Sequence, residues 1–472
     1  MRLGVCCLAV FCLMVPTGAC AETETLEQAW ALAYRINPSL QAERAKLRAT
    51  DEEVSQALSH WRPSIDATAN VGKTYQYVPA QAVFGTADFA DTTRGYGVQV
   101  TQPLFRGLRT DSETEAAENQ VLSGRAKLDD AEQQLFLDTA TAFLDIVRDQ
   151  AVLDSDRDNE NVLEQKLKET RVRAQAGDLT QTDVRQAESR LARAHVARYQ
   201  AESSLTTDRA SYERLVGKMP EKLTAPDLRL TDPEQLDDVL HLAETRNPKV
   251  IAARYDIDEA KAEVDLNKGS LLPEINLVGS STRNWGQNIT IPGREDSSQI
   301  LIQATMPLYR AGTDYSKSRA AEQTVTQRRM ELEEARHKAI EAANNSWQGF
   351  ETAQAALEAD KDEVEAAREA LKGVREESKV GTRTTLDVLN AEQELLDAKI
   401  DLAKSSHDRD LAIIQIKAAI GELTVASLKL PGSVYDPKRH YDDVRNQWIG
   451  FSEDDDRYMA APEKQDTRET PP

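Results

Sequence analysis

The sequence predicts a mainly α-helical fold with a smaller β part, assembled from an internal tandem duplication. The segment Val380–Glu392 (VGTRTTLDVLNAE) has a degenerate twin at Arg173–Glu188, and aligning Gly381 on Gly177 gives an offset of 204 residues. Abundant Ala, Glu, Gln and Arg with few aromatic residues favours long helices of the coiled-coil type. Each half also has two stretches of alternating apolar and polar residues, the pattern of strands with one buried face.

The first 21 residues have the composition of a signal peptide. Arg2 precedes an apolar stretch from Leu3 to Val15, and Ala19-Cys20-Ala21 forms a small-x-small cleavage signal. We therefore expect residues 1–21 to be removed on export. All four cysteines lie in this segment, so the mature chain would have neither a disulfide nor a thiol site. The alternative is a lipoprotein signal, which would leave Cys20 lipidated at the new N-terminus.

The rest of the composition argues against several classes of function. The formal net charge of −22 makes nucleic acid an unfavourable partner. The most apolar downstream stretch, Leu411 to Ile420, contains Lys417 and is too short for a membrane helix. The sequence has no His-x-x-x-His, Gly-x-Ser-x-Gly or phosphate-loop motif, so we expect no enzyme, no cofactor and no metal ligand. The six histidines are scattered: His60, His195, His241, His337, His407 and His440.

The duplication predicts four parts in the chain. These are the signal peptide (1–21), a first repeat (22–225), a second repeat (226–430) and a C-terminal tail (431–472), partly disordered after about residue 451.

Each repeat is expected to open with two helices. The segment Leu26–Leu40 (LEQAWALAYRINPSL) corresponds to Leu236–Val250 (LDDVLHLAETRNPKV) at an offset of 210. In both, an amphipathic helix is stopped by Asn-Pro. A second helix then follows, to about Leu58 in the first repeat and about Lys268 in the second.

The period then changes from helical to two. Ile65, Ala67, Ala69 and Val71 alternate with polar or small residues, and Pro103 comes near the end of the next alternating stretch. The second repeat shows the same order. We expect strands over 65–77, 96–105, 274–285 and 299–309 with loops at 78–95 and 286–298, giving β-hairpins at about 64–105 and about 274–309.

Beyond the strands, each repeat predicts a long coiled-coil hairpin, at about 108–217 and about 312–421. Proline is absent from both stretches, and a single helix over Arg109–Ala174 would be about 100 Å long. Gly177 and Gly381 begin the turns of these hairpins, because glycine adopts positive φ without steric cost and the following Thr-x-x-Asp caps the next helix. Gly217 and Gly421 are expected to end the returning helices.

Four strands cannot close a barrel by themselves. Unpaired edges are excluded from lipid, so strands that span a membrane require the chain to oligomerise. Two copies would give eight strands with a filled interior, and three would give twelve with a lumen. The residues alone leave both numbers open.

The mature chain resembles the TolC family of outer-membrane channel proteins. The resemblance lies in the duplicated halves, the Asn-Pro pairs, the strands bounded by proline and the segment from Val380 to Ser405. It implies a homotrimer with a 12-stranded barrel in the outer membrane and a helical barrel in the periplasm. It also implies a function as exit duct of a tripartite export system, with a periplasmic adaptor and an inner-membrane ABC or RND transporter as partners. The alternative from the coiled coils is that the chain is itself a periplasmic adaptor.

The tail carries a further sign of function. The pattern of Tyr435, His440, Val444 and Trp448 is similar to that of the branch that serves type I secretion. Multidrug efflux stays open as a second use, because efflux members share the core motif.

The resemblance also implies a gate at the two hairpin turns. Arg383 matches an arginine that links the second turn to an aspartate of the first, and Thr182-Asp183 matches the Thr-Asp pair it reaches. Asp387 matches one position of a ring of carboxylates at the constriction, and Asn390 stands at the other. The alternative is that Asp183 and Asp387 only cap their helices.

Overall fold

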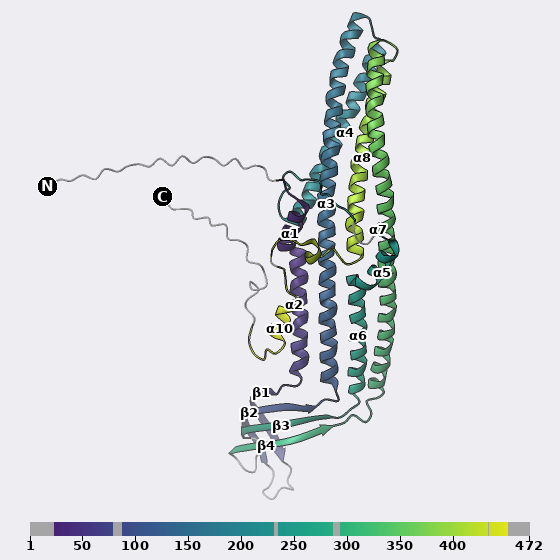
Figure 1. Ribbon diagram of the computed structural model, residues 1–472. Coiled ribbons are helices and arrows are strands. Elements are labelled where there is room, and N and C mark those ends of the chain that lie inside the picture. The colour runs from purple at the N-terminus through teal and green to yellow at the C-terminus, as the bar shows by residue number, and fades with distance from the viewer. Residues whose placement is uncertain (1–22, 79–86, 231–234, 287–292, 433, 452–472) are drawn as a thin grey trace, which may run out of the picture. The chain divides into compact units, whose positions relative to one another are not determined.

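The computed structural model describes residues 23–78, 87–230, 235–286, 293–432 and 434–451. The expected signal peptide with Cys20 and the last part of the tail lie outside the described residues. None of the helices in the described ranges has an apolar stretch of the length that crossing a membrane requires. The elements follow in this order (Figure 1): α1 (Leu26–Ile36), α2 (Pro38–Ser59), β1 (Ser64–Val78), β2 (Ala87–Phe105), α3 (Arg109–Ala176), α4 (Gln181–Val216), α5 (Leu236–Arg246), α6 (Pro248–Gly269), β3 (Glu274–Trp285), β4 (Arg294–Thr305), α7 (Thr313–Lys379), α8 (Thr385–Ala419), α9 (Val425–Leu428) and α10 (Arg439–Val444).

The two halves repeat one order of elements, as the duplication predicts: α1 to α4 with β1 and β2 return as α5 to α8 with β3 and β4. Each Asn-Pro pair separates two helices and caps the second. Asn37 Oδ1 accepts hydrogen bonds from the amides of Ser39 (3.0 Å) and Leu40 (3.3 Å). Asn247 Oδ1 accepts one from the amide of Lys249 (3.0 Å). The proline then occupies the first helical turn, where its missing N–H removes no hydrogen bond.

Packing divides the chain into two compact units that do not coincide with the two sequence repeats. The turn unit comprises Met1–Ala33, Asp138–Arg229 and Glu351–Leu411. The sheet unit comprises Tyr34–Leu137, Leu230–Phe350 and Ala412–Pro472. Each unit takes segments from both repeats, because α3, α7 and α8 are long enough to contribute residues to both units.

The sheet unit contains one four-stranded antiparallel sheet in the order β1-β2-β3-β4 (Figure 1). Pairing of β2 with β3 joins the hairpins of the two repeats, with Gly97 opposite Thr282. Glycine permits this close approach, because a Cβ on Gly97 would lie 2.8 Å from Thr282 Cγ2. Within one chain β1 and β4 are the edges of the sheet, and the backbone groups along an edge need partners from elsewhere.

The strand β2 is longer than the sequence predicts. It begins at Ala87 rather than at residue 96, so the expected loop at 78–95 is partly strand. The composition of this stretch, rich in Ala, Thr, Gly and Asp, is typical of loops. The ladder with β1 nevertheless continues to the pair Val78 and Ala87, and cross-strand pairing outweighs local composition.

The strand β4 is shifted towards the N-terminus from its expected span of 299–309, and the expected loop at 286–298 is correspondingly too long. Its first residues are charged, and they pair with residues of β3. Asp296 Oδ1 accepts a hydrogen bond from Arg283 Nε at 2.7 Å. The strand ends at Thr305, short of Pro307, which has no amide to donate to a ladder.

The long helices confirm the predicted coiled coils. α3 has 68 residues and α7 has 67, and each is followed by a shorter helix, α4 or α8. Small and apolar residues at three- and four-residue spacing are buried along these shorter helices, which allows close packing. The buried residues at this spacing are Val184, Ala187, Ala194, Ala201, Leu205, Tyr212 and Leu215 on α4, and Val388, Ala391, Ala398, Ala412, Ile416 and Ala419 on α8. Leu191, Leu395 and Leu402 are half-buried.

The tail contains a short helix that the sequence analysis did not predict. α10 packs against α2 in the sheet unit. His440 Nδ1 lies 3.1 Å from Asp51 Oδ2, and both side chains are buried. Arg445 Nη2 donates to Glu118 Oε1 on α3 at 2.6 Å. His440, one of the residues that make the tail similar to the secretion branch, therefore contacts α2, and Arg445 binds α3.

Candidate functional site at the two helical turns

The first turn joins α3 to α4 in the turn unit. Gly177 has φ +89° and the amide of Asp178 donates to Arg173 O at 2.9 Å, the usual way to end a helix with a left-handed residue. α4 then starts with a reciprocal cap. Asp183 Oδ2 accepts from the amide (2.9 Å) and hydroxyl (2.7 Å) of Thr180, and Thr180 Oγ1 accepts from the amide of Asp183 at 3.3 Å. Thr182 is exposed on the first turn of α4.

The second turn, between α7 and α8, repeats this geometry. Gly381 has φ +83°, and the amide of Thr382 donates to Glu377 O at 3.1 Å. Asp387 Oδ2 accepts from the amide (2.9 Å) and hydroxyl (2.8 Å) of Thr384, whose Oγ1 accepts from the amide of Asp387 at 3.2 Å. The two turns, which start at Gly177 and Gly381, thus have the same backbone hydrogen-bond pattern and the same Thr-x-x-Asp cap.

Both turn carboxylates cap their own helices, as the capping alternative expects. The pKa of Asp183 is lowered by the hydrogen bonds from the Thr180 hydroxyl and amide. The pKa of Asp387 is lowered by the equivalent bonds from the Thr384 amide and hydroxyl, with a smaller contribution from Arg383. These carboxylates therefore stay ionised and engaged in their caps at neutral pH.

The expected link from Arg383 to Asp183 is absent from the described residues of the single chain. Arg383 Nε instead donates to Glu377 Oε2 at 2.8 Å, and both side chains are about half exposed. The physical reason is proximity. Glu377 lies in the last turn of α7, just before the same turn, six residues from Arg383.

Asn390 has a partner that the sequence analysis did not identify. Its Oδ1 accepts a hydrogen bond from Arg190 Nη2 at 2.8 Å, which joins α8 to α4 within the turn unit. An amide oxygen accepts this bond without adding a charge. The residue that the resemblance implies for the second ring position is thus neutral, and it accepts a hydrogen bond from a cation of the other repeat.

A duplicated ion pair braces each turn, and the sequence analysis missed it. Arg171 Nη2 donates to Glu188 Oε1 at 2.8 Å between α3 and α4. At the offset of 204, Arg375 Nη2 donates to Glu392 Oε1 at 3.2 Å between α7 and α8. The offset that aligns the two turns would have revealed these pairs.

Comparisons with known proteins match this duplicated architecture. The sequence profile described as "Outer membrane efflux protein" matches residues 31–218 and 239–422, one match in each repeat. The chain is 33% identical over 445 residues to the outer membrane efflux protein BepC of Brucella suis, covering 94% of this chain and 95% of BepC. It is 25% identical to the outer membrane protein TolC of Vibrio cholerae (85% and 91% covered) and 25% identical to the proteases secretion protein PrtF of Dickeya chrysanthemi (86% and 90%).

A solved structure shows the same fold. The CmeC outer membrane channel of Campylobacter jejuni superposes with a TM-score of 0.77 at 12% identity, covering 89% of each chain. The profile spans most of both repeats, and the identity to BepC extends over nearly the whole of both proteins. The chain therefore belongs to the outer membrane efflux protein family.

Proposed function

We propose that this protein is the exit duct of a tripartite export system that serves type I protein secretion, multidrug efflux or both. The observation that carries the proposal is the duplicated arrangement of one β-hairpin and one long helical hairpin per half, matched by the family profile in each half. A periplasmic adaptor, the alternative from the coiled coils alone, does not agree with membership of a family of outer-membrane channels. The same membership favours a conduit rather than an enzyme.

The proposed assembly is a homotrimer in the outer membrane, with the helical part in the periplasm. The four-stranded sheet supports it, because three copies would supply the twelve strands of a barrel with a lumen and would pair the edges at β1 and β4. Mass measurement of the detergent-solubilised mature protein tests the number of chains. We expect three chains in the outer-membrane fraction, and a monomer or a soluble periplasmic pool would contradict the assembly.

The proposed partners are a periplasmic adaptor and an inner-membrane ABC or RND transporter. The printed name of PrtF concerns the secretion of proteases, and the tail from Tyr435 to Trp448 is similar to that of the secretion branch. We expect deletion of the gene to abolish secretion of a protein or to raise sensitivity to detergents and dyes. An unchanged set of secreted proteins together with unchanged sensitivity would contradict both uses.

The proposed gate consists of Thr182, Asp183, Arg383, Asp387 and Asn390. Asp183 and Asp387 hold the turns in shape, and Arg383 supplies the contact that closes the pore in the trimer. Arg383 is suited to this role because its partner Glu377 is exposed, and an exposed ion pair costs only about 0–1 kcal/mol to exchange for another. Threefold symmetry would repeat the new contact three times, and a total of a few kcal/mol is enough to favour the closed state of the gate over the open state.

Conductance in planar bilayers tests the gate without disturbing the caps. We expect Arg383→Ala to raise the conductance, while Glu377→Gln, which removes the partner within the chain but keeps the arginine, leaves the pore closed. Neither substitution touches the hydrogen bonds of Thr180 or Thr384, so both turns stay intact. Equal conductance of Arg383→Ala and the wild type would show that the turns have no gating contact at this arginine.

A further inference from the structure

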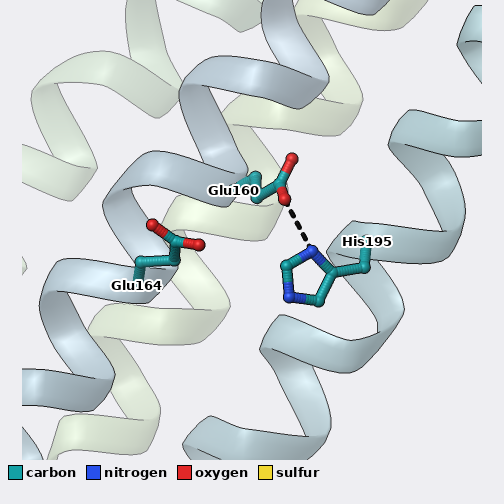
Figure 2. A group of neighbouring side chains, drawn as sticks. All are labelled: Glu160, Glu164 and His195. Carbon is teal, nitrogen blue, oxygen red and sulfur yellow. Dashed lines mark hydrogen bonds and ion pairs between the residues drawn. The ribbon is translucent and has the colours of Figure 1, made fainter.

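The turn unit contains a second group of side chains that converge, on α3 and α4. Glu160 and Glu164 lie one helical turn apart on α3, and His195 lies on α4 (Figure 2). One ligand atom from each, two carboxylate oxygens and one imidazole nitrogen, lies within 4.8 Å of the other two. A spacing of four residues puts both carboxylates on one face of α3, and the neighbouring helix supplies the imidazole.

The hydrogen bonds of the group orient two of its three members. Glu160 Oε1 lies 2.6 Å from His195 Nδ1, and Glu160 Oε2 accepts from Arg198 Nε at 2.6 Å. The Glu160 side chain is only 13% exposed, which fixes the direction of its carboxylate. Glu164 is exposed, and its carboxylate makes no hydrogen bond or ion pair with any residue that the structure describes. The ion pairs of Glu160 therefore do not account for the second carboxylate, that of Glu164, at the same point.

We propose that Glu160, Glu164 and His195 bind one divalent transition-metal ion per chain, with Zn²⁺ the best match. An imidazole with two carboxylates suits Zn²⁺, Co²⁺, Ni²⁺ and Cu²⁺, whereas Ca²⁺ and Mg²⁺ take oxygen ligands only. Three protein ligands leave a fourth tetrahedral position for water. Arg198 donates to the outer oxygen of Glu160, as outer-shell groups that orient a ligating carboxylate do.

The bound ion would cross-link α3 and α4 in the hairpin that ends at Gly177. No metal ligand was expected because the sequence has no His-x-x-x-His motif. Here the third ligand comes from the neighbouring helix. Only the packing of α3 against α4 brings the imidazole to the two glutamates.

Calorimetric titration with Zn²⁺ and the visible absorption spectrum with Co²⁺ test the site. The protein should be the full mature chain without a histidine tag, in detergent, after treatment with EDTA and removal of the chelator. We expect one ion per chain, and His195→Ala and Glu164→Gln should each weaken binding by about tenfold or more. The control His337→Ala, which removes an exposed histidine on α7, should bind like the wild type.

The two variants guard against different failures. His195→Ala removes a contact of Glu160 and therefore also tests a loss of structure, but Glu164→Gln removes no interaction among the described residues and should fold normally. The proposal would be overturned if the wild type showed no saturable binding of Zn²⁺ or Co²⁺. Binding by both variants with wild-type affinity would do the same.

Discussion

The substitution Arg375→Ala is expected to loosen the second turn far more than Arg171→Ala loosens the first. The two arginines occupy equivalent positions, but the carboxylates they pair with differ in environment. The Glu392 side chain is 4% exposed, against 29% for Glu188. Glu188 also keeps Arg185 as a second partner, whereas Glu392 Oε2 is buried and has no hydrogen-bond partner among the described residues. Removal of Arg375 therefore leaves a buried carboxylate without its cation.

These environments determine the free-energy cost of each substitution. An exposed pair with a second cation at hand contributes about 0–1 kcal/mol. Loss of a hydrogen bond to a buried charged group costs about 1.5–3 kcal/mol. Arg375 is itself 44% exposed, so water would reach part of the site, and we expect about 2 kcal/mol at the second turn. That value corresponds to an increase of about 30-fold in the equilibrium constant for local opening.

Hydrogen exchange read by mass spectrometry measures this opening in the detergent-solubilised protein. Peptides from the ends of α7 and α8 should exchange about 30-fold faster in Arg375→Ala, and those from α3 and α4 at most about fivefold faster in Arg171→Ala. The double variant Arg375→Ala with Glu392→Gln should return towards the wild type, because the buried charge is gone. Equal effects at the two turns, or a double variant as loose as Arg375→Ala, would refute the reasoning.

Three further predictions concern stability. Gly381→Ala should lower the free energy of unfolding by about 1 kcal/mol, because the residue has φ +83°. Gly373→Ala, inside α7 with room for a Cβ, should raise the free energy of unfolding by about 0.5–1 kcal/mol, and thermal unfolding of both variants measures the difference. Burial raises the pKa of Glu132 from 4.5 to about 7, so the folded state binds the proton more tightly and stability should fall as pH rises through this window; melting temperatures across pH should show that Glu132→Gln removes this fall. His440→Ala should cost about 3 kcal/mol by leaving Asp51 buried without its imidazole partner, and limited proteolysis should then cut the tail faster.

The sequence predicted the parts of the fold that depend on local chemistry. Gly177 and Gly381 begin the turns because positive φ favours glycine, and Asn37 and Asn247 cap helices because their side chains reach amides two or three residues on. The ends of β2 and β4 were predicted wrongly, because a strand extends as far as its neighbour pairs with it. The ion pair between Arg283 and Asp296 illustrates the point, since Asp296 lies in the expected loop and is held in β4 by Arg283 on β3.

The candidate site was predictable to a similar degree. Its positions and caps followed from the duplicated motif, but its partners depend on which helices are neighbours. Arg190 reaches Asn390 from another repeat, and no local pattern indicates that contact. Arg383 was expected to bind Asp183 of the first turn, yet within the chain it donates a hydrogen bond to the carboxylate of Glu377.

The two turns have the same backbone conformation and differ in the side chains that could line a pore. The glycine at positive φ, the Thr-x-x-Asp cap and the Arg–Glu pair occur in both turns, so they account for the shape of each turn and not for any difference between them. The offset of 204 places Leu179 opposite Arg383 and Gln186 opposite Asn390. The second turn therefore has an exposed arginine, Arg383, where the first turn has the half-buried Leu179. The proposed closing contact therefore depends on Arg383 of the second turn, and the first turn has no cation at the equivalent position.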